Sequence, residues 1–158
     1  MRVDTAHRRI PALREEVFRA FTRPGLLAAW LPPAGMHGHL VHFDLRSGGG
    51  FRSVLTYETH DEPGKYSAHS DVTDTHIVTM EPPQRVVWAV DFPSADPAFA
   101  GTMYMEWTLE AVFGGTDVTV QAKDVPRGID AADHVAGLES SLAKLAALFE
   151  HRQPARRG

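Results

Sequence analysis

The segment TMYMEWTLEAVF, residues 102–113, constrains the fold more than any other stretch of this sequence. Apolar residues occupy every second position, with mostly polar residues between them. Because successive side chains of a strand point to opposite faces, this period of two predicts a strand with one apolar and one hydrated face, as in antiparallel sheets. The predicted apolar face comprises Met103, Met105, Trp107, Leu109, Ala111 and Phe113. A sheet built from such strands needs a second layer to cover its apolar face.

The end of the chain supplies a matching cover. From Ile129 to about His151, apolar residues recur at steps of three and four, which predicts one long amphipathic helix. Its predicted stripe comprises Val135, Leu138, Leu142, Leu145 and Phe149. We therefore expect the sheet to curl around this helix and to leave a cavity between the helix and the concave face.

Shorter segments complete the predicted order of elements. A first strand is expected over residues 2–10, then a helix that opens at Pro11, then a second short helix over residues 26–31. Further strands are expected from residue 37 and at 51–57, 66–80, 85–92 and 116–123. The prediction is an α+β fold: a curved antiparallel sheet of about six or seven strands wrapped around a long C-terminal helix, with two short helices after the first strand.

Length and composition exclude several classes of protein. The 158 residues fit one domain, expected over residues 1–152, with a flexible tail at 153–158. With no cysteine there is no disulfide and no thiolate catalysis, and the net charge of -4 argues against a nucleic-acid partner. No apolar run approaches the length of a membrane helix and no signal peptide is apparent, so we expect a cytoplasmic protein without membrane contact.

The stretch FDLRSGGGF, residues 43–51, carries three consecutive glycines. A phosphate-binding loop would lead into a helix and end in Lys-Ser or Lys-Thr. Here the glycines run into Phe51-Arg52-Ser53, which continues with strand periodicity. The stretch therefore predicts a hairpin turn, with Asp44 and Arg46 facing outward and able to pair with neighbouring strands.

Five strings in this order resemble the activator-of-heat-shock-protein-90-ATPase homologue family, part of the START and pollen-allergen-like (SRPBCC) group of helix-grip folds. The strings are FTRPGLLAAWL (21–31), FDLRSGGGF (43–51), MEPPQRVVW (80–88), TLEAVFGGTDVTV (108–120) and GLESSLAKLAALFE (137–150). The resemblance covers nearly the whole chain and implies the fold predicted above. The broader group includes lipid carriers, hormone receptors and polyketide cyclases, so the fold alone does not imply a reaction.

Two departures from the family lie near the expected cavity. Many relatives have tryptophan directly after a glycine at the start of the last helix segment, whereas here Gly137 is followed by Leu138. A glycine that often precedes the strand before the EPP turn is replaced by Thr75 or a neighbour. The ligand of the relatives therefore does not carry over to this chain.

Among the nine histidines, His37 and His39 share parity with Val41, Phe43 and Leu45, which would direct them to the covered face. An inward His-x-His pair could hold a metal if a third ligand came from elsewhere in the chain. The possible third ligands are His69, His76, His134 and Glu139. The alternative, which we favour, places the pair on a loop at the cavity mouth, so no metal or cofactor is predicted.

Two further histidines are candidates for acid–base chemistry. Asp74 and His76 share parity with Val72 and would form an inward acid–base pair, unless a bulge reverses the faces and leaves them on an exposed edge. His134 lies one step from the helical stripe, where it could face the cavity mouth. Trp30, on the second short helix, could close one end of the cavity or belong to the core.

The favoured function is binding of a small hydrophobic or aromatic molecule in the cavity. The predicted ligand-binding residues are Trp30, Phe43, Leu55, Tyr57, His69, His76, Trp88, Val90, Met103, Met105, Trp107, His134, Leu138 and Leu142. One alternative is an enzyme of the cyclase, dehydratase or hydrolase type in which His acts as general acid or base. A second is a cochaperone-like protein-binding module, and the sequence leaves open a homodimer.

Overall fold

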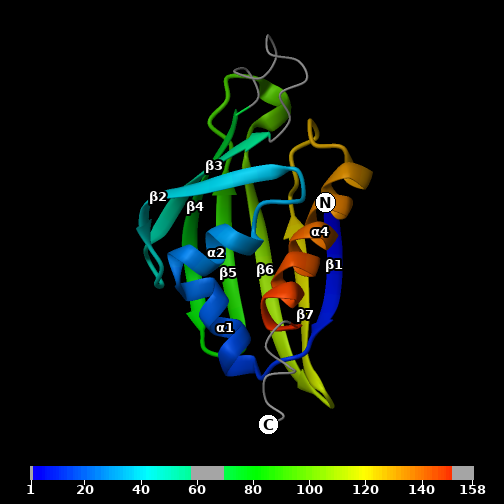
Figure 1. The fold of residues 1–158 in the computed structure, drawn as a ribbon. Coiled ribbons are helices and arrows are strands. Elements are labelled where there is room, and N and C mark those ends of the chain that lie inside the picture. Colours follow the sequence, from blue (N-terminus) through cyan, green and yellow to red (C-terminus); the bar gives the residue numbers. More distant parts are fainter. Residues whose placement is uncertain (1, 58–69, 151–158) are drawn as a thin grey trace.

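Seven antiparallel strands form one sheet in the order β1-β7-β6-β5-β4-β3-β2 (Figure 1). The computed structural model describes residues 2–57 and 70–150. The strands are β1 (Val3–Ile10), β2 (Met36–Asp44), β3 (Gly50–Tyr57), β4 (Ser70–Glu81), β5 (Arg85–Asp91), β6 (Thr102–Val112) and β7 (Gly115–Lys123). The helices are α1 (Arg14–Thr22), α2 (Pro24–Trp30), the short 3₁₀ helix η1 (Pro97–Phe99) and α4 (Ala131–Glu150).

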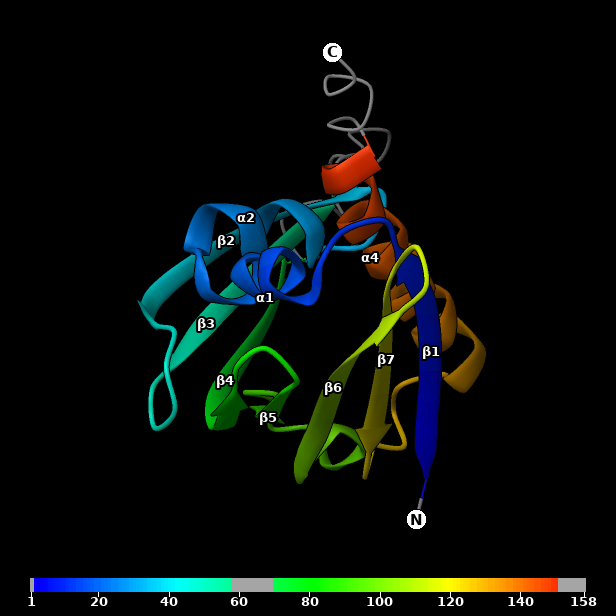
Figure 2. The ribbon, with the colours of Figure 1, turned by 90° about the horizontal axis from the view of Figure 1, so that it is seen from below.

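The sheet curves, and all three α-helices lie across its concave side (Figure 2). β1 returns to pair with β7, from Val3 opposite Lys123 to Ile10 opposite Thr116, so the first and last strands are neighbours. α4 packs mainly along β1, α2 contacts β2, and α1 contacts β6 and β7. This is the helix-grip arrangement that the periodicity and the family resemblance predicted.

The C-terminal helix buries the predicted stripe against the sheet except at Val135, which is half-buried. Leu142 and Leu145 are fully buried, and Leu138 and Phe149 are nearly so. The helix begins at Ala131, slightly later than predicted, because the Asp130 carboxylate caps it by accepting the backbone N–H of Asp133 at 3.0 Å.

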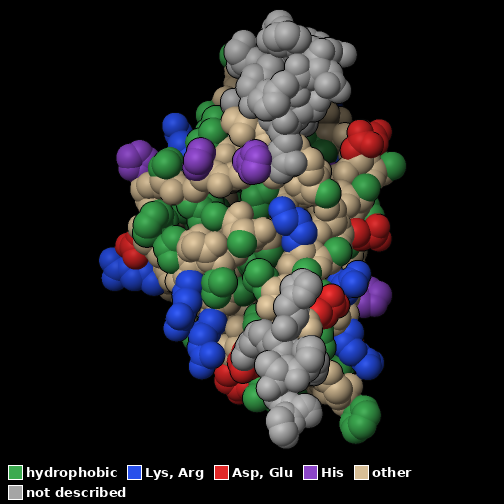
Figure 3. Space-filling model, in the orientation of Figure 1, with side chains coloured by type: hydrophobic (Ala, Val, Ile, Leu, Met, Phe, Trp, Pro, Cys, Tyr) green, Lys and Arg blue, Asp and Glu red, His purple; other side chains and the backbone are tan. Residues whose placement is uncertain are grey.

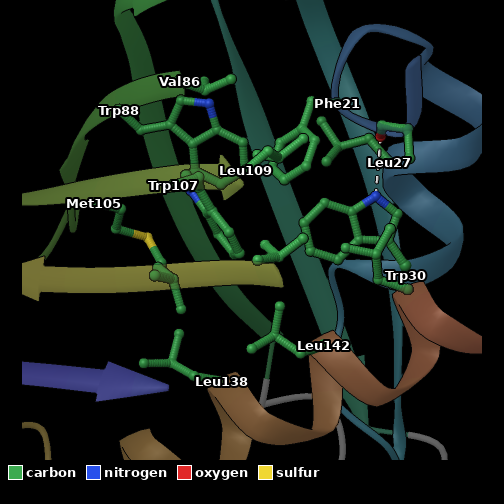
Figure 4. Close-up of a cluster of buried hydrophobic side chains, with 14 of the residues drawn as sticks. Phe21, Leu27, Trp30, Val86, Trp88, Met105, Trp107, Leu109, Leu138 and Leu142 are labelled. Carbon is green, nitrogen blue, oxygen red and sulfur yellow. Dashed lines mark hydrogen bonds between the residues drawn. The ribbon is translucent and has the colours of Figure 1, made fainter. Parts of the chain in front are cut away.

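A cluster of aromatic rings forms the core beneath α1 and α2 (Figure 4). Trp107 lies edge to face with Phe21, Trp30 and Trp88, at centroid distances of 5.3, 5.4 and 5.2 Å. Such edge-to-face pairs add to the stabilisation that burial of the rings provides. Trp30 therefore belongs to the core, which was one of the two predicted alternatives.

The two short helices start at different residues from those predicted. α1 begins at Arg14 rather than Pro11, because the chain first makes a turn in which the N–H of Ala12 donates to the carbonyl of Ile10. α2 begins at Pro24, whose missing N–H costs nothing in the first turn of a helix.

The glycine run forms the predicted hairpin between β2 and β3, with Asp44 opposite Gly50. Gly48 adopts a positive φ of 87°. A Cβ on Gly50 would overlap the carbonyl oxygen of Thr75 on the adjacent strand β4, so the close strand approach requires glycine. Arg46 and Asp44 do face solvent, but they pair with each other at 2.8 Å rather than with neighbouring strands.

Two bulges reverse faces that strict alternation had predicted. In β2 the register shifts between Val41 and Asp44, and His42 has a φ of 52°. As a result His37 and His39 are exposed, and Phe43 is 51% exposed rather than inward. Histidine side chains accordingly gather in a row over β2 at the surface (Figure 3).

The second bulge lies in β4, between Ile77 and Thr79. Before it, Thr75 and Ile77 face the core, so Asp74 and His76 face outward, as the alternative with a bulge had predicted. The prediction that Asp74 and His76 form an inward acid–base pair is therefore wrong. Asp74 instead pairs with Arg52 at 2.7 Å on the outer face.

The predicted apolar face of β6 is buried from Met103 to Leu109, as expected, but Ala111 and Phe113 at its end are exposed. Phe113 is 97% exposed, because Phe113 and Gly114 form the two-residue turn between the paired residues Val112 and Gly115. None of the helices within residues 2–57 and 70–150 is both long and apolar enough to span a bilayer.

Candidate functional site

A pocket of about 270 Å³ lies between the concave face of the sheet and α4. This volume is near the lower end of the range of about 300–1,000 Å³ that is usual for ligand sites. Its walls come from the sheet, from α4 and from the segment after α2. The lining residues are Leu31, Pro33, Met36, Phe51, Ser53, Leu55, Thr73, Thr75, Trp88, Val90, Phe92, Met103, Met105, Ile129, Asp133, His134, Gly137, Leu138 and Ser141.

The walls of this pocket are mainly apolar because the inward faces of β5 and β6 contribute to it. Trp88 and Val90 on β5 and Met103 and Met105 on β6 follow the predicted alternation. Leu138 points from α4 toward them (Figure 4). Methionine side chains adapt readily to irregular apolar shapes, so this wall suits a nonpolar ligand surface.

Three hydroxyl groups interrupt the apolar wall at β3 and β4. Ser53 lies directly opposite Thr73 in the β3–β4 ladder, and Thr75 lies two residues further along β4. Ser53 and Thr75 are buried, and both line the pocket. A buried hydroxyl gains free energy when it finds a partner, so this wall can bind a polar atom of a ligand.

At the other side of the pocket, Arg2, Asp4 and His134 form a chain of side-chain contacts. His134 Nδ1 lies 2.7 Å from Asp4 Oδ2, and Arg2 Nη2 donates to the same oxygen at 2.9 Å. Asp4 is only 5% exposed, and the His134 side chain is 16% exposed. This joins the first strand to the first turns of α4 through a buried carboxylate.

The hydrogen bonds from Arg2 hold the pKa of the Asp4 carboxyl below its ordinary value, against the opposing effect of burial. The contact with His134 lowers the pKa of Asp4 further. Asp4 is therefore a carboxylate near neutral pH and can only accept hydrogen bonds.

The structure brings half of the predicted site residues to the pocket. Those that line it are Leu55, Trp88, Val90, Met103, Met105, His134 and Leu138. Three others are core residues that do not border it: Trp30, Trp107 and Leu142. The side chain of Tyr57 and the whole of His69 lie outside the described part of the chain.

Phe43 and His76 do not reach the pocket, because the bulges described above turn them outward. The metal site considered for His37 and His39 required both side chains to face the covered side of the sheet. Both are exposed on β2 instead, and Glu139, one of the possible third ligands, is exposed on α4. Within the described residues no group of three or more His, Asp or Glu side chains could hold a metal ion.

The most informative residue that the sequence analysis missed is Asp4. The sequence did contain a sign of its burial, because Asp4 lies on the same inward face of the first strand as Ala6 and Ile10. An acidic residue at such a position needs a partner, because an isolated buried charge is costly. The hydroxyls of Ser53, Thr73 and Thr75 were also missed, since polar side chains on an inward face carry no pattern of their own.

Charged side chains on the outer face of the sheet pair with one another. Arg85 Nε lies 2.7 Å from Glu106 Oε2, and Lys123 Nζ lies 3.3 Å from Glu106 Oε1. These ion pairs hold the pKa of Glu106 below its ordinary value, mainly through the bond from Arg85. They are ordinary surface contacts, and binding to a chaperone stays a prediction of the family resemblance.

The sequence profile of the family described as "Activator of Hsp90 ATPase homolog 1-like protein" matches residues 11–150. No curated protein matches the chain significantly.

Solved structures resemble it over nearly its whole length. A protein from Chromobacterium violaceum has a TM-score of 0.82 at 28% sequence identity, covering 94% of this chain and 96% of that chain. The AHSA1 protein from Silicibacter pomeroyi has a TM-score of 0.77 at 19% identity, covering 96% and 100%. DynU16, a putative protein in the dynemicin biosynthetic locus, has a TM-score of 0.66 at 23% identity, and the match covers 98% of this chain but 49% of that chain.

Proposed function

This chain belongs to the Activator of Hsp90 ATPase homolog 1-like family, and we propose that it binds a compact, mostly apolar small molecule in the pocket between its sheet and α4. The observation that carries the proposal is the composition of the pocket walls. Apolar side chains from β5, β6 and α4 lie beside the hydroxyl-bearing residues Ser53, Thr73 and Thr75 of β3 and β4. Pockets of this kind, apolar with a few polar groups, are typical of small-molecule sites.

The volume limits the size of the ligand. An apolar cavity of about 150 Å³ accepts benzene. At about 270 Å³ this pocket suits a compound of one or two rings rather than a long acyl chain. Leu138 contributes to this volume, because a tryptophan at the same position on α4 would occupy part of it.

Burial of apolar surface would supply most of the binding free energy, at about 25 cal/mol per Å² before the costs of association are subtracted. The hydroxyls of Ser53, Thr73 and Thr75 would fix the orientation of a ligand that carries a polar atom at one end. Each net hydrogen bond contributes roughly 1 kcal/mol.

The test compares wild type with Leu138→Trp by isothermal titration with 2-methylnaphthalene, a two-ring apolar probe. The larger side chain fills the pocket, so we expect its affinity to fall by at least about tenfold, which corresponds to roughly 1.4 kcal/mol. Val78→Trp is the matched control, because Val78 is 44% exposed and is not a lining residue. Equal affinities in all three proteins would refute binding in this pocket.

The contact between Asp4 and His134 favours a second candidate, proton transfer to or from a bound ligand. A carboxylate that orients an imidazole at the edge of a pocket is an arrangement used in general acid–base catalysis. Exchange of the hydrogens beside the carbonyl of 2-indanone in D₂O, followed by proton NMR, tests it. We expect wild type to accelerate the exchange and His134→Asn to abolish the acceleration, and a rate equal to that of buffer would reject this candidate.

A further inference from the structure

We infer that the pocket selects ligands that carry a neutral hydrogen-bond donor, such as a phenolic hydroxyl, directed at Nε2 of His134. The inference rests on the proposed ligand-binding function and names the class of ligand. It depends on three features of the site: the proton on the His134 ring, the direction in which the ring faces, and the charges beside it.

The contact with Asp4 determines which ring nitrogen of His134 carries the proton. Asp4 accepts two hydrogen bonds from Arg2, at 2.9 and 3.3 Å, and is held as a carboxylate. A carboxylate has no proton to donate, so across the 2.7 Å contact Nδ1 of His134 must be the donor. In the neutral imidazole the proton therefore lies on Nδ1, and Nε2 keeps its lone pair and acts as an acceptor.

The ring presents this acceptor to the pocket. His134 lines the pocket whereas Asp4 does not, and because Nδ1 is held at Asp4, we place the opposite edge of the ring toward the pocket. Nε2 lies on that edge, across the ring from Nδ1. Among the described residues, the His134 ring is hydrogen-bonded to the side chain of Asp4 alone, through Nδ1. Nε2 is therefore available to a ligand.

The surrounding charge favours a neutral donor over an anion. Asp133, in the first turn of α4, also lines the pocket and adds a second acceptor-only group. A carboxylate ligand would meet the charge of Asp133, whereas the charge of Asp4 is offset by its ion pair with Arg2. The hydroxyls of Ser53, Thr73 and Thr75 can donate as well as accept a hydrogen bond, so they do not discriminate between donor and acceptor ligands. The selection of a donor ligand therefore depends on the His134 side of the pocket.

The experiment measures the affinities of 2-naphthol and 2-methylnaphthalene by isothermal titration. The two probes have nearly the same shape and differ in one hydroxyl. For wild type we expect 2-naphthol to bind about five- to tenfold more tightly, the effect of one hydrogen bond.

His134→Asn is the test variant, because an asparagine amide can still donate to Asp4 in place of Nδ1 but presents nothing in place of Nε2. We expect its preference for 2-naphthol over 2-methylnaphthalene, measured as the ratio of the two affinities, to disappear, while its thermal unfolding midpoint stays near that of wild type. His76→Asn is the matched control, because His76 is exposed on β4 outside the pocket, and it should keep the wild-type preference.

A second measurement needs no variant. Two-bond ¹H–¹⁵N NMR of the imidazoles in wild type should show His134 protonated at Nδ1, with an Nε2 resonance that moves on addition of 2-naphthol and stays in place with 2-methylnaphthalene. Protonation at Nε2 alone, equal affinities of wild type for the two probes, or a preference that His134→Asn retains would overturn this inference. The proposed function would fail separately, by binding neither probe.

Discussion

Trp30 and Trp107 are the two largest fully buried side chains in the described part of the chain, and they differ in one polar contact. Trp30 Nε1 donates to the carbonyl oxygen of Ala20 at 2.9 Å (Figure 4). That carbonyl lacks a helical partner because the residue four positions on is Pro24, which has no N–H. Trp107 Nε1 is also buried, but it has no hydrogen-bond partner among residues 2–57 and 70–150. One indole thus completes the end of α1, and the other contributes its ring alone.

We predict that Trp30→Phe destabilises the protein more than Trp107→Phe, by about 1–2 kcal/mol in the free energy of unfolding. Both changes remove the same atoms from fully buried sites, but only the first leaves a carbonyl without its partner. Urea unfolding of the two variants measures the difference. Equal losses of stability would mean that the Trp30–Ala20 bond contributes nothing.

Asp4 makes the stability of the protein depend on pH. Its folded-state pKa is lowered by Arg2 first and then by His134, so its contribution is present above the ordinary Asp pKa of about 3.9 and is lost as pH falls through the lower folded value. We predict that Asp4→Asn lowers the free energy of unfolding by roughly 1–3 kcal/mol at neutral pH. The gap from wild type should narrow below about pH 4.

Urea unfolding between neutral and acidic pH checks this dependence on Asp4. Asp117→Asn is the control, because Asp117 is a half-buried partner of the exposed Arg9 at 3.8 Å and should matter by less than about 1 kcal/mol at any pH. A gap for Asp4→Asn that stays constant down to acidic pH would show that the charge of Asp4 is not the source of the stability.

Among the elements, regular alternation was predictable and its interruptions were not. The inward faces of β5 and β6 and the stripe of α4 follow from periods of two and 3.6, because each depends only on neighbouring residues. The bulges near His42 and Val78 depend on how one strand meets the next, and no local pattern marks them. That is why Phe43 and His76 were assigned to the wrong face.

The β2–β3 hairpin, in contrast, was predicted, because consecutive glycines between two strand-like segments indicate a turn. We predict that Gly50→Ala destabilises the protein by at least about 2 kcal/mol, since a Cβ there would overlap the Thr75 carbonyl. Gly25→Ala in α2 is the control, because its added methyl group meets no atom and alanine favours the helix by up to about 1 kcal/mol. Thermal and urea unfolding compare them, and a neutral Gly50→Ala would contradict the close approach.

For the whole molecule, the sequence predicted the layers and much of the apolar wall of the pocket, but not how its polar groups come together. The sheet and α4 need each other to bury their apolar faces, so their pairing follows from composition and period. The polar groups of the pocket come together through long-range contacts, since Asp4 and His134 lie 130 residues apart. Ser53 and Thr73 likewise become neighbours only through the β3–β4 register. Contacts between residues so far apart in the chain leave no local pattern in a single sequence.

The methionines provide the most direct test that the pocket is the binding site. Three of the five line it, namely Met36, Met103 and Met105, while Met80 packs against the core outside it. With ¹³C-methyl methionine labelling and titration with 2-naphthol, we predict that the methyl resonances of the three lining residues shift together and saturate at a common affinity, while that of Met80 stays in place. Shifts confined to Met80, or no saturable shift at the three lining residues, would contradict ligand binding between the sheet and α4.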